Sequence, residues 1–279
     1  MILVQEMETT VFFILLKRST KRMDCKIIFF DVDGTLINYE DGSIVSSTKN
    51  ALHILKNKGI RLVAATGRPL SMCHELHELG IDTFITANGA YVRHGEQIIH
   101  TIPIAQEVVA SVKDFADGHQ HSLTFFTEQL SMNGIQHATT LKAMNETLSL
   151  VAYPPINENI VNEQVYLMCL YVDEQVEKTY ITQFPNLSFE RWHPMITNVL
   201  QNDVSKSIAV KAVLHYFKLQ PNEAIAFGDG DNDIDMLEQV GYGVAMGNGS
   251  VALKNIADYV TMTSHEGGID YALRKLQLI

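Results

Sequence analysis

The segment IIFFDVDGT, residues 27–35, decides how this chain can be interpreted. Its four apolar residues, 27–30, predict a strand that is buried in a core. Two carboxylates, Asp31 and Asp33, follow at the end of that strand, and Gly34 lets the backbone turn sharply after them. In an open α/β sheet, ligands and chemistry gather at the carboxyl ends of the strands. Asp31 and Asp33 are therefore the first candidates for functional residues.

A second acidic cluster has the same setting far downstream. The segment GDGDND, residues 228–233, directly follows the apolar run 224–227. One Asp-x-Asp segment alone is as consistent with an acidic turn as with a functional site. Because the pattern recurs behind a second predicted strand, the sequence favours one shared acidic site over two unrelated turns.

Composition narrows the class of protein. The 279 residues carry a formal net charge of −11, which argues against a nucleic-acid partner, because such a partner requires a basic face. An anionic substrate would have to be held by local cations. Cys25, Cys73 and Cys169 are scattered, odd in number and without metal-ligand spacing. We therefore expect reduced thiols in a cytoplasmic protein.

We expect residues 1–22 to form an extension outside the fold. Their apolar run, 11–16, is far shorter than the roughly 20 residues that a membrane-spanning helix needs. Basic residues follow this run rather than precede it, which does not fit a signal peptide. The sequence predicts no membrane partner.

The two ends of the remaining chain alternate between short apolar strands and amphipathic helices. Such alternation is typical of an α/β protein with a doubly wound, Rossmann-like parallel sheet. The expected strands are 26–30, 61–65, 83–86, 224–227, 242–245 and 258–261, and the expected helices are 47–58, 205–217, 232–238, 250–256 and 267–276.

The middle of the chain has a different pattern. A hairpin signal over 91–99 and further strand and helix patterns up to 191 indicate an antiparallel sheet with helices on one face. We therefore predict an inserted α+β cap domain. The expected division is a core domain from 23–88 and 191–279, with the cap at 89–190.

Four groups of polar residues follow or flank predicted core strands: Asp31 with Asp33, Thr66, Lys206, and Asp229 with Asn232 and Asp233. Together they supply what phosphoryl transfer to an aspartate requires. A carboxylate that attacks a phosphate dianion meets repulsion of about 4 kcal/mol per pair of unit charges about 4 Å apart. A cation must offset this repulsion, and Mg²⁺ suits an all-oxygen, acid-rich site.

These residue types predict distinct roles. Asp31 would be the nucleophile and a metal ligand, and Asp229 a second metal ligand. Asp233 would orient the metal's water or supply a further ligand, and Lys206 would neutralise charge on the phosphoryl oxygens. Asp33 would act as general acid and then as general base.

Thr66 and the amides around Gly67 would hold a phosphoryl oxygen. Other readings of single residues stay open. Lys206 follows Ser205 at a helix start, so it is also consistent with a solvated first-turn lysine. The segment 247–249, GNG, reads as a loop before a helix, although its position after a core strand would also let it line the site.

The chain resembles the haloacid dehalogenase-like hydrolase superfamily. The segments DVDGTL (31–36), TGR (66–68), Lys206 and GDGDND (228–233) are similar, in this order, to its four motifs. The insert lies between the second and third motifs, as in members with a type-II cap. The segments ANGA (87–90), DVSK (203–206) and AMGN (245–248) are similar to the Cof-type phosphatases.

This resemblance implies a ligand set. Mg²⁺ would be held by Asp31, the main-chain carbonyl of Asp33, and Asp229. Phosphate would be contacted by the backbone at Val32, by Thr66 and Gly67, by Lys206 and by Asn232. The chain departs from the subgroup at Ser207, where glycine is commoner.

We therefore expect a Mg²⁺-dependent phosphomonoester hydrolase that acts on a small phosphorylated metabolite through an aspartyl-phosphate. A phospho-accepting module similar to response-regulator receivers is the alternative. Asp33 weighs against it, because such a switch needs no acid two residues after its nucleophile. A phosphomutase is a third option. The sequence does not indicate the oligomeric state.

Overall fold

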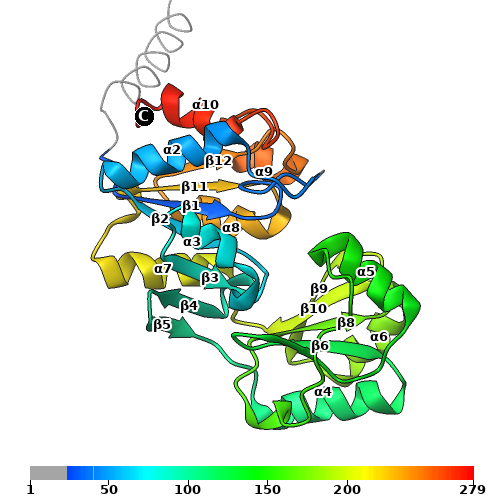
Figure 1. Ribbon diagram of the computed structural model, residues 1–279. Helices are drawn as coiled ribbons and strands as arrows, with labels where there is room; N and C mark the ends of the chain where they lie inside the picture. The colour runs from blue at the N-terminus through cyan, green and yellow to red at the C-terminus, as the bar shows by residue number, and fades with distance from the viewer. Residues whose placement is uncertain (1–23, 40) are drawn as a thin grey trace, which may run out of the picture.

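The computed structural model describes residues 24–39 and 41–279 (Figure 1). The expected extension, 1–22, lies outside the described residues. Two sheets organise the rest. The larger has eight strands in the order β13-β12-β11-β1-β2-β3-β4-β5, and the smaller has five in the order β7-β6-β8-β10-β9.

The larger sheet is parallel over most of its width. Strand β1 (Ile27–Asp31) lies between β2 (Arg61–Ala65) and β11 (Ala224–Gly228) and runs parallel to both. The other strands are β3 (Thr83–Thr86), β4 (Tyr91–His94), β5 (Gln97–Thr101), β12 (Tyr242–Ala245) and β13 (Tyr259–Val260). Strand β1 is buried at every position, as expected for a central parallel strand that is covered on both faces.

Helices cover both faces of this sheet. One face packs against α2 (Ser46–Asn57), α3 (His74–Glu78) and α10 (Gly268–Lys275). The other packs against α7 (Lys206–Phe217), α8 (Ile234–Gln239) and α9 (Val251–Ile256). The predicted doubly wound α/β core is therefore confirmed, and the carboxyl ends of β1, β2 and β11 lie side by side at one edge of the sheet.

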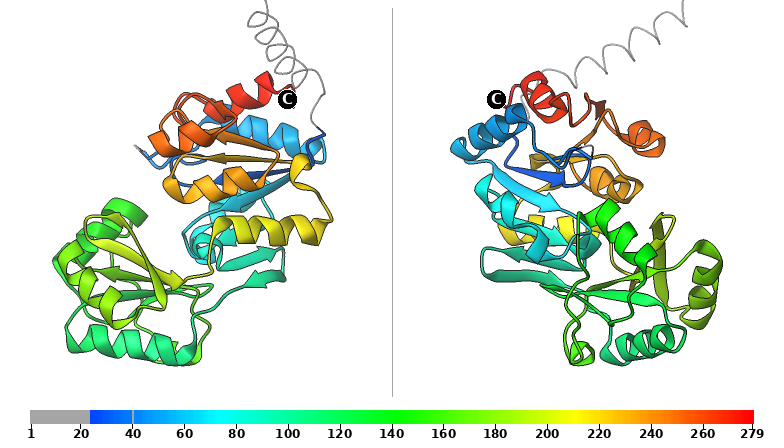
Figure 2. Two further views of the ribbon diagram at one scale, coloured as in Figure 1. Left: turned by 180° about the vertical axis from the view of Figure 1, so that it is seen from behind. Right: turned by 45° about the vertical axis from the view of Figure 1, so that its right-hand side comes forward.

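The smaller sheet belongs to the insert, below the larger sheet in Figure 1. Its strands are β6 (Ser122–Phe126), β7 (Leu130–Met132), β8 (Leu167–Tyr171), β9 (Leu187–His193) and β10 (Ile196–Gln201), and its pairings are antiparallel. Helices α4 (Gln106–Gly118) and α6 (Glu174–Gln183) pack on one face, and α5 (Ala138–Leu148) packs on the other. Both views of Figure 2 show the insert as a separate layer beside the core.

Three details differ from the sequence-based expectations. The helices of the insert are predicted on one face of its sheet, but α5 packs on the face opposite α4 and α6, because both faces of this sheet carry apolar side chains. The hairpin of β4 and β5 was expected in the insert, but β4 pairs with β3 and extends the core sheet. Strand β10 was not predicted, and with β9 it carries the smaller sheet past residue 190 to Gln201. A hairpin pattern indicates two paired strands, but it does not indicate which sheet edge they join.

No helix among residues 24–39 and 41–279 is long and apolar enough to cross a membrane.

Candidate active site

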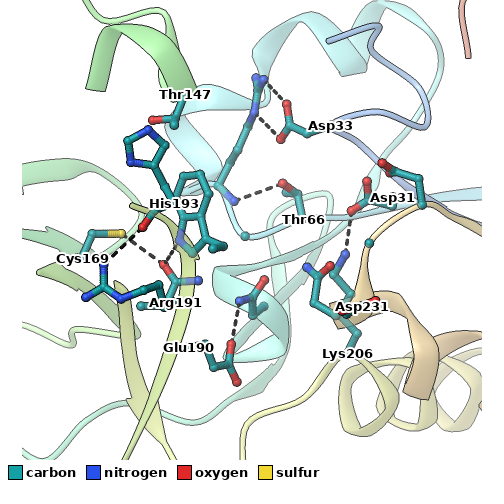
Figure 3. Close-up of a pocket in the computed structure, with 18 of the residues that line it drawn as sticks. Asp31, Asp33, Thr66, Thr147, Cys169, Glu190, Arg191, His193, Lys206 and Asp231 are labelled. Atoms are coloured by element: carbon teal, nitrogen blue, oxygen red, sulfur yellow. Dashed lines mark hydrogen bonds and ion pairs between the residues drawn. The ribbon is translucent and has the colours of Figure 1, made fainter. Parts of the chain in front are cut away.

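A cavity of about 1090 Å³ lies between the carboxyl edge of the core sheet and the insert. Its core side includes Asp31, Thr66 and Lys206, which lie close together although they are far apart in the chain (Figure 3). Asp229 lines the same side of the cavity. Its other side is formed by residues of α5, β8, β9 and β10.

Lys206 neutralises the deepest part of this site. Its Nζ lies 2.6 Å from Oδ1 of Asp31 and 2.6 Å from Oδ1 of Asp233, and its side chain is buried. Lys206 is the first residue of α7, where Ser205 caps the helix by accepting a hydrogen bond from the amide of Ile208. A solvated first-turn lysine is therefore excluded.

Burial and charge shift the pKa values of these groups in consistent directions. Burial raises the pKa of Asp31 well above its usual range, and the charge of Asp233 raises it further, while Lys206 opposes both. Burial also raises the pKa of Asp229, to about 6, again with a contribution from Asp233. Burial opposes the charge of Lys206, but Asp233 and Asp31 raise its pKa above the ordinary value. The cluster therefore holds more negative charge than one lysine offsets.

Asp229 is fixed by neighbours from two loops. Its Oδ1 accepts a hydrogen bond from Oγ1 of Thr35 at 2.9 Å, and Asn248 Nδ2 lies 3.4 Å from its Oδ2. The same Nδ2 donates to the carbonyl of Gly34 at 2.8 Å. Asn248, which the sequence placed in a loop of uncertain role, thus joins the turn after β1 to the turn after β11.

Gly34 is required where these turns meet. Its φ of +84° lies in the left-handed region, and a Cβ there would come within 2.3 Å of Asp229 Oδ2 and 2.2 Å of Tyr39 Cε2. A glycine alone meets both constraints.

Asp233 organises the loop that carries Asp229. Its Oδ2 accepts hydrogen bonds from the backbone amides of Asp229 and Gly230, both at 2.9 Å, while its Oδ1 faces Lys206. Both oxygens are therefore engaged with the protein. This arrangement favours a positioning carboxylate over a direct metal ligand.

The acidic cluster fits a divalent cation. Carboxylate oxygens of Asp31, Asp229 and Asp233 lie within 4.8 Å of one another, and all three residues are buried. Buried carboxylates in such number are costly unless a cation neutralises them. The all-oxygen donor set suits Mg²⁺ rather than softer metals.

A second loop lies beside the acids. Thr66 is buried at the end of β2, its Oγ1 accepts a hydrogen bond from the amide of Arg68, and Gly67 follows at the cavity wall. Asn88 packs over Gly67, with its Oδ1 3.0 Å from the position of a Cβ there. Gly89 (φ +109°) allows a close approach to the carbonyl of Ser205, and this contact seats the start of α7.

Asp33 does not lie among the other carboxylates as a free acid. Arg68 binds it through two hydrogen bonds, from Nε to Oδ2 at 2.9 Å and from Nη2 to Oδ1 at 2.5 Å. Arg68 belongs to the TGR segment, 66–68, but its residue type alone predicts no role for it. The only sequence signal for this ion pair is the positive charge of Arg68 directly after Thr66 and Gly67, which complements the negative charge of Asp33.

The remaining predicted residues lie at or beside the cavity. Asn232 lines it, whereas the side chain of Val32 is buried in the core, so that only its backbone can face the site. Ser207 donates its amide proton to Oδ2 of Asp235 at 2.9 Å. The serine at this unusual position is therefore accommodated without displacing Lys206.

The doubly wound sheet, the inserted α+β domain and the lysine-bridged acids at the strand ends define a class of phosphoryl-transfer hydrolases. Comparison with known proteins agrees. Residues 28–273 match the family described as haloacid dehalogenase-like hydrolase. The chain belongs to this family.

Individual relatives cover nearly the whole chain. A Bacillus subtilis (strain 168) protein named "Putative phosphatase YkrA" is 35% identical over 261 residues, which are 92% of this chain and 100% of that protein. A hypothetical protein from Geobacillus kaustophilus HTA426 shares the fold with a TM-score of 0.85, 34% identity, and coverage of 91% of this chain and 100% of that one. The subclass IIB sugar phosphatase BT4131 gives a TM-score of 0.78, 33% identity and the same coverage. The predicted phosphatase class is confirmed.

Proposed function

We propose that the protein is a Mg²⁺-dependent phosphomonoester hydrolase that forms an aspartyl-phosphate on Asp31. One observation carries the proposal. One carboxylate oxygen of Asp31 is held by Lys206 at 2.6 Å, so the side chain is oriented at the end of β1 and faces the cavity. A fixed carboxylate beside a cation is what nucleophilic attack on a phosphate ester requires.

The residues divide the reaction between them. A carboxylate oxygen of Asp31 forms a bond to phosphorus while the bond to the ester oxygen breaks. Asp33, with one oxygen released from Arg68 and protonated, gives that proton to the departing alkoxide. Asp33 then takes a proton from water, whose oxygen attacks phosphorus and releases Asp31 and inorganic phosphate. The phosphoryl oxygens are held by Thr66, Gly67, Lys206, Asn232 and the backbone at Val32.

Asp31, Asp229 and the main-chain carbonyl of Asp33 would hold the metal, and Asp233 would support them. When bound, Mg²⁺ supplies positive charge that offsets the repulsion between carboxylate and phosphate.

The proposed substrate is a small phosphorylated metabolite. The cavity lies beneath the insert, whose residues would face the leaving group and exclude bulk water. Relatives support this class: BT4131 is described as a sugar phosphatase, and YitU of Bacillus subtilis, 27% identical, as a 5-amino-6-(5-phospho-D-ribitylamino)uracil phosphatase.

Phosphate release from p-nitrophenyl phosphate tests the function. We expect turnover with Mg²⁺ and none after chelation, and acid quenching should trap a protein heavier by one phosphoryl group. Asp31→Asn should abolish both signals while circular dichroism stays native. Turnover without metal, or a trapped phosphoryl group in the Asp31→Asn protein, would contradict the proposal.

A further inference from the structure

The insert contributes a polar row to the cavity that no sequence motif indicated. Cys169 on β8, Asn198 on β10 and Glu190 on β9 are neighbours across three strands, because Asn198 pairs with both of the others. All three residues line the cavity, as does Trp192, which is 49% exposed. Figure 3 shows Cys169 and Glu190 on the side opposite Asp31.

The orientation of the Asn198 amide is fixed by its neighbours. Its Oδ1 accepts hydrogen bonds from Nε1 of Trp192 at 2.9 Å and from Sγ of Cys169 at 3.3 Å. An indole N–H can only donate, so the atom that faces it must be the amide oxygen. Burial raises the pKa of Cys169 to about 12, which keeps the thiol protonated as the second donor.

The amide nitrogen of Asn198 is consequently left for a ligand. Within the described part of the chain, Nδ2 has no hydrogen-bond partner, although Asn198 is only 8% exposed. This nitrogen is not one of the buried side-chain atoms that lack a partner, so it is open to the cavity and can donate to a ligand there.

Glu190 supplies an acceptor beside this donor. One carboxylate oxygen accepts a hydrogen bond from Nδ2 of Asn88 at 3.3 Å, while the residue remains exposed in the cavity. Directly opposite residues on antiparallel strands have Cβ atoms about 5 Å apart. Asn198 and Glu190 thus present a donor and an acceptor at a spacing that suits adjacent hydroxyl groups, next to the indole of Trp192.

The cations that line this cavity are already engaged. Arg68 binds Asp33, and Lys206 binds the buried acids. Arg191 directs Nε to Glu177 and Nη1 to three carbonyls. Its Nη2 has no hydrogen-bond partner among the described residues, but it is buried and therefore not exposed to a ligand in the cavity. Acidic residues, in contrast, line the cavity outside the metal cluster, namely Glu146, Glu190, Asp231 and Asp235. Glu146 has Lys142 and His193 beside it, whereas Glu190 has no ion-pair partner within the described part of the chain. A second anionic group on a substrate would therefore meet repulsion beside Glu190.

We propose that Glu190, Trp192 and Asn198 form the leaving-group subsite, and that this subsite selects hydroxylated leaving groups without a second anionic group. This inference rests on the proposed phosphatase function. Asn198 donates to one hydroxyl, Glu190 accepts from its neighbour, and the indole packs on the C–H face of the carbon chain. The negative charge of Glu190 lets the subsite bind hydroxyl groups and also disfavours leaving groups that carry a second anionic group.

A pair of esters that differ only at the far end tests this. Sorbitol 6-phosphate ends in a hydroxymethyl group, and 6-phosphogluconate ends in a carboxylate. We expect kcat/KM to be at least about tenfold higher for sorbitol 6-phosphate. In Glu190→Gln, which removes the charge and keeps the size, this ratio should fall by at least about threefold, because the anionic ester gains relative to the neutral one.

Glu174→Gln is the matched control, since Glu174 is an exposed carboxylate at the start of α6 and does not line the cavity. The control should keep the wild-type ratio. Equal kcat/KM for the two esters in the wild type, or an unchanged ratio in Glu190→Gln, would overturn the subsite. Failure of the phosphatase function itself looks different, because neither ester nor p-nitrophenyl phosphate would then release phosphate with Mg²⁺.

Discussion

Arg68 and Asp33 form a bidentate ion pair at the wall of the cavity. The guanidinium Nε and Nη2 donate in parallel to the two oxygens of the carboxylate, a geometry that only arginine provides. Asp33 follows β1 and Arg68 follows β2, so the pair ties the two loops together. The carboxylate that we assign as acid and base is therefore oriented by a residue that does not enter the proton transfer.

Arg68→Ala should lower kcat by about tenfold to a hundredfold, because Asp33 loses its orientation. The cost in unfolding free energy should stay near or below about 1 kcal/mol, since the pair is partly exposed. Arg68→Lys is the informative comparison, because it keeps the positive charge but removes the bidentate hydrogen-bond geometry of the guanidinium. Steady-state kinetics measures the effect on kcat, and urea unfolding measures the effect on the free energy of unfolding. An unchanged kcat in Arg68→Ala would refute this positioning role.

Lys206→Met should destabilise the metal-free protein by about 3–5 kcal/mol, because it leaves Asp31 and Asp233 buried without their cation. Adding Asp233→Asn to this variant should recover part of the loss by removing one buried charge. Lys211→Met, on an exposed position of the same helix, is the control and should change the free energy of unfolding by no more than about 0.5 kcal/mol. Chemical denaturation measures all three, and equal losses in Lys206→Met and Lys211→Met would contradict the buried network.

Gly34→Ala should weaken Mg²⁺ binding and destabilise the protein. The new Cβ would overlap Oδ2 of Asp229, in addition to adopting a positive φ. Gly59→Ala is a matched control, because Gly59 also has a positive φ (+76°) but has nothing within 4 Å of its Cβ position. Gly59→Ala should lower the free energy of unfolding only by the cost of placing an alanine at a positive φ, about 1–2 kcal/mol. Calorimetric titration with Mg²⁺ should show weakened binding in Gly34→Ala alone.

The pH dependence of metal binding follows from Asp229. Burial raises the folded-state pKa of Asp229 to about 6, above the ordinary value of an aspartate, so in the absence of metal the folded state binds a proton more tightly than the unfolded state does. This contribution to stability is present at low pH and is lost as the pH rises through about 6. Metal-free protein should therefore lose stability between about pH 4 and pH 7.

Mg²⁺ competes with that proton, so its effect on Tm should be a few degrees larger at pH 7.5 than at pH 5. Thermal unfolding with and without Mg²⁺ at both pH values measures this difference. Asp229→Asn should weaken the dependence without abolishing it, because the pKa of Asp31 is raised as well. A Mg²⁺-induced shift in Tm that is equal at both pH values would argue against Asp229 as the titrating group.

Local sequence patterns predicted most of the fold, because the strands and helices of the core are each marked by residues close together in the chain. Short apolar runs bounded by glycine and acids indicate parallel strands, and helical periodicity indicates the helices between them. The hairpin of β4 and β5 was assigned to the insert and β10 was missed, since sheet membership depends on long-range pairing. Within the site, the motif residues Asp31, Lys206 and Asp229 do converge on one cavity.

The sequence by itself determined the doubly wound core, the presence of an α+β insert and the family, because strand-end acids and a glycine turn must occur in fixed local patterns. Only the tertiary structure decided that Arg68 holds Asp33, that Asn248 bridges two loops, and that Glu190, Trp192 and Asn198 line the same cavity as the acids. These relationships join residues from different strands and loops. Their chemistry depends on distance and burial, which no local pattern encodes.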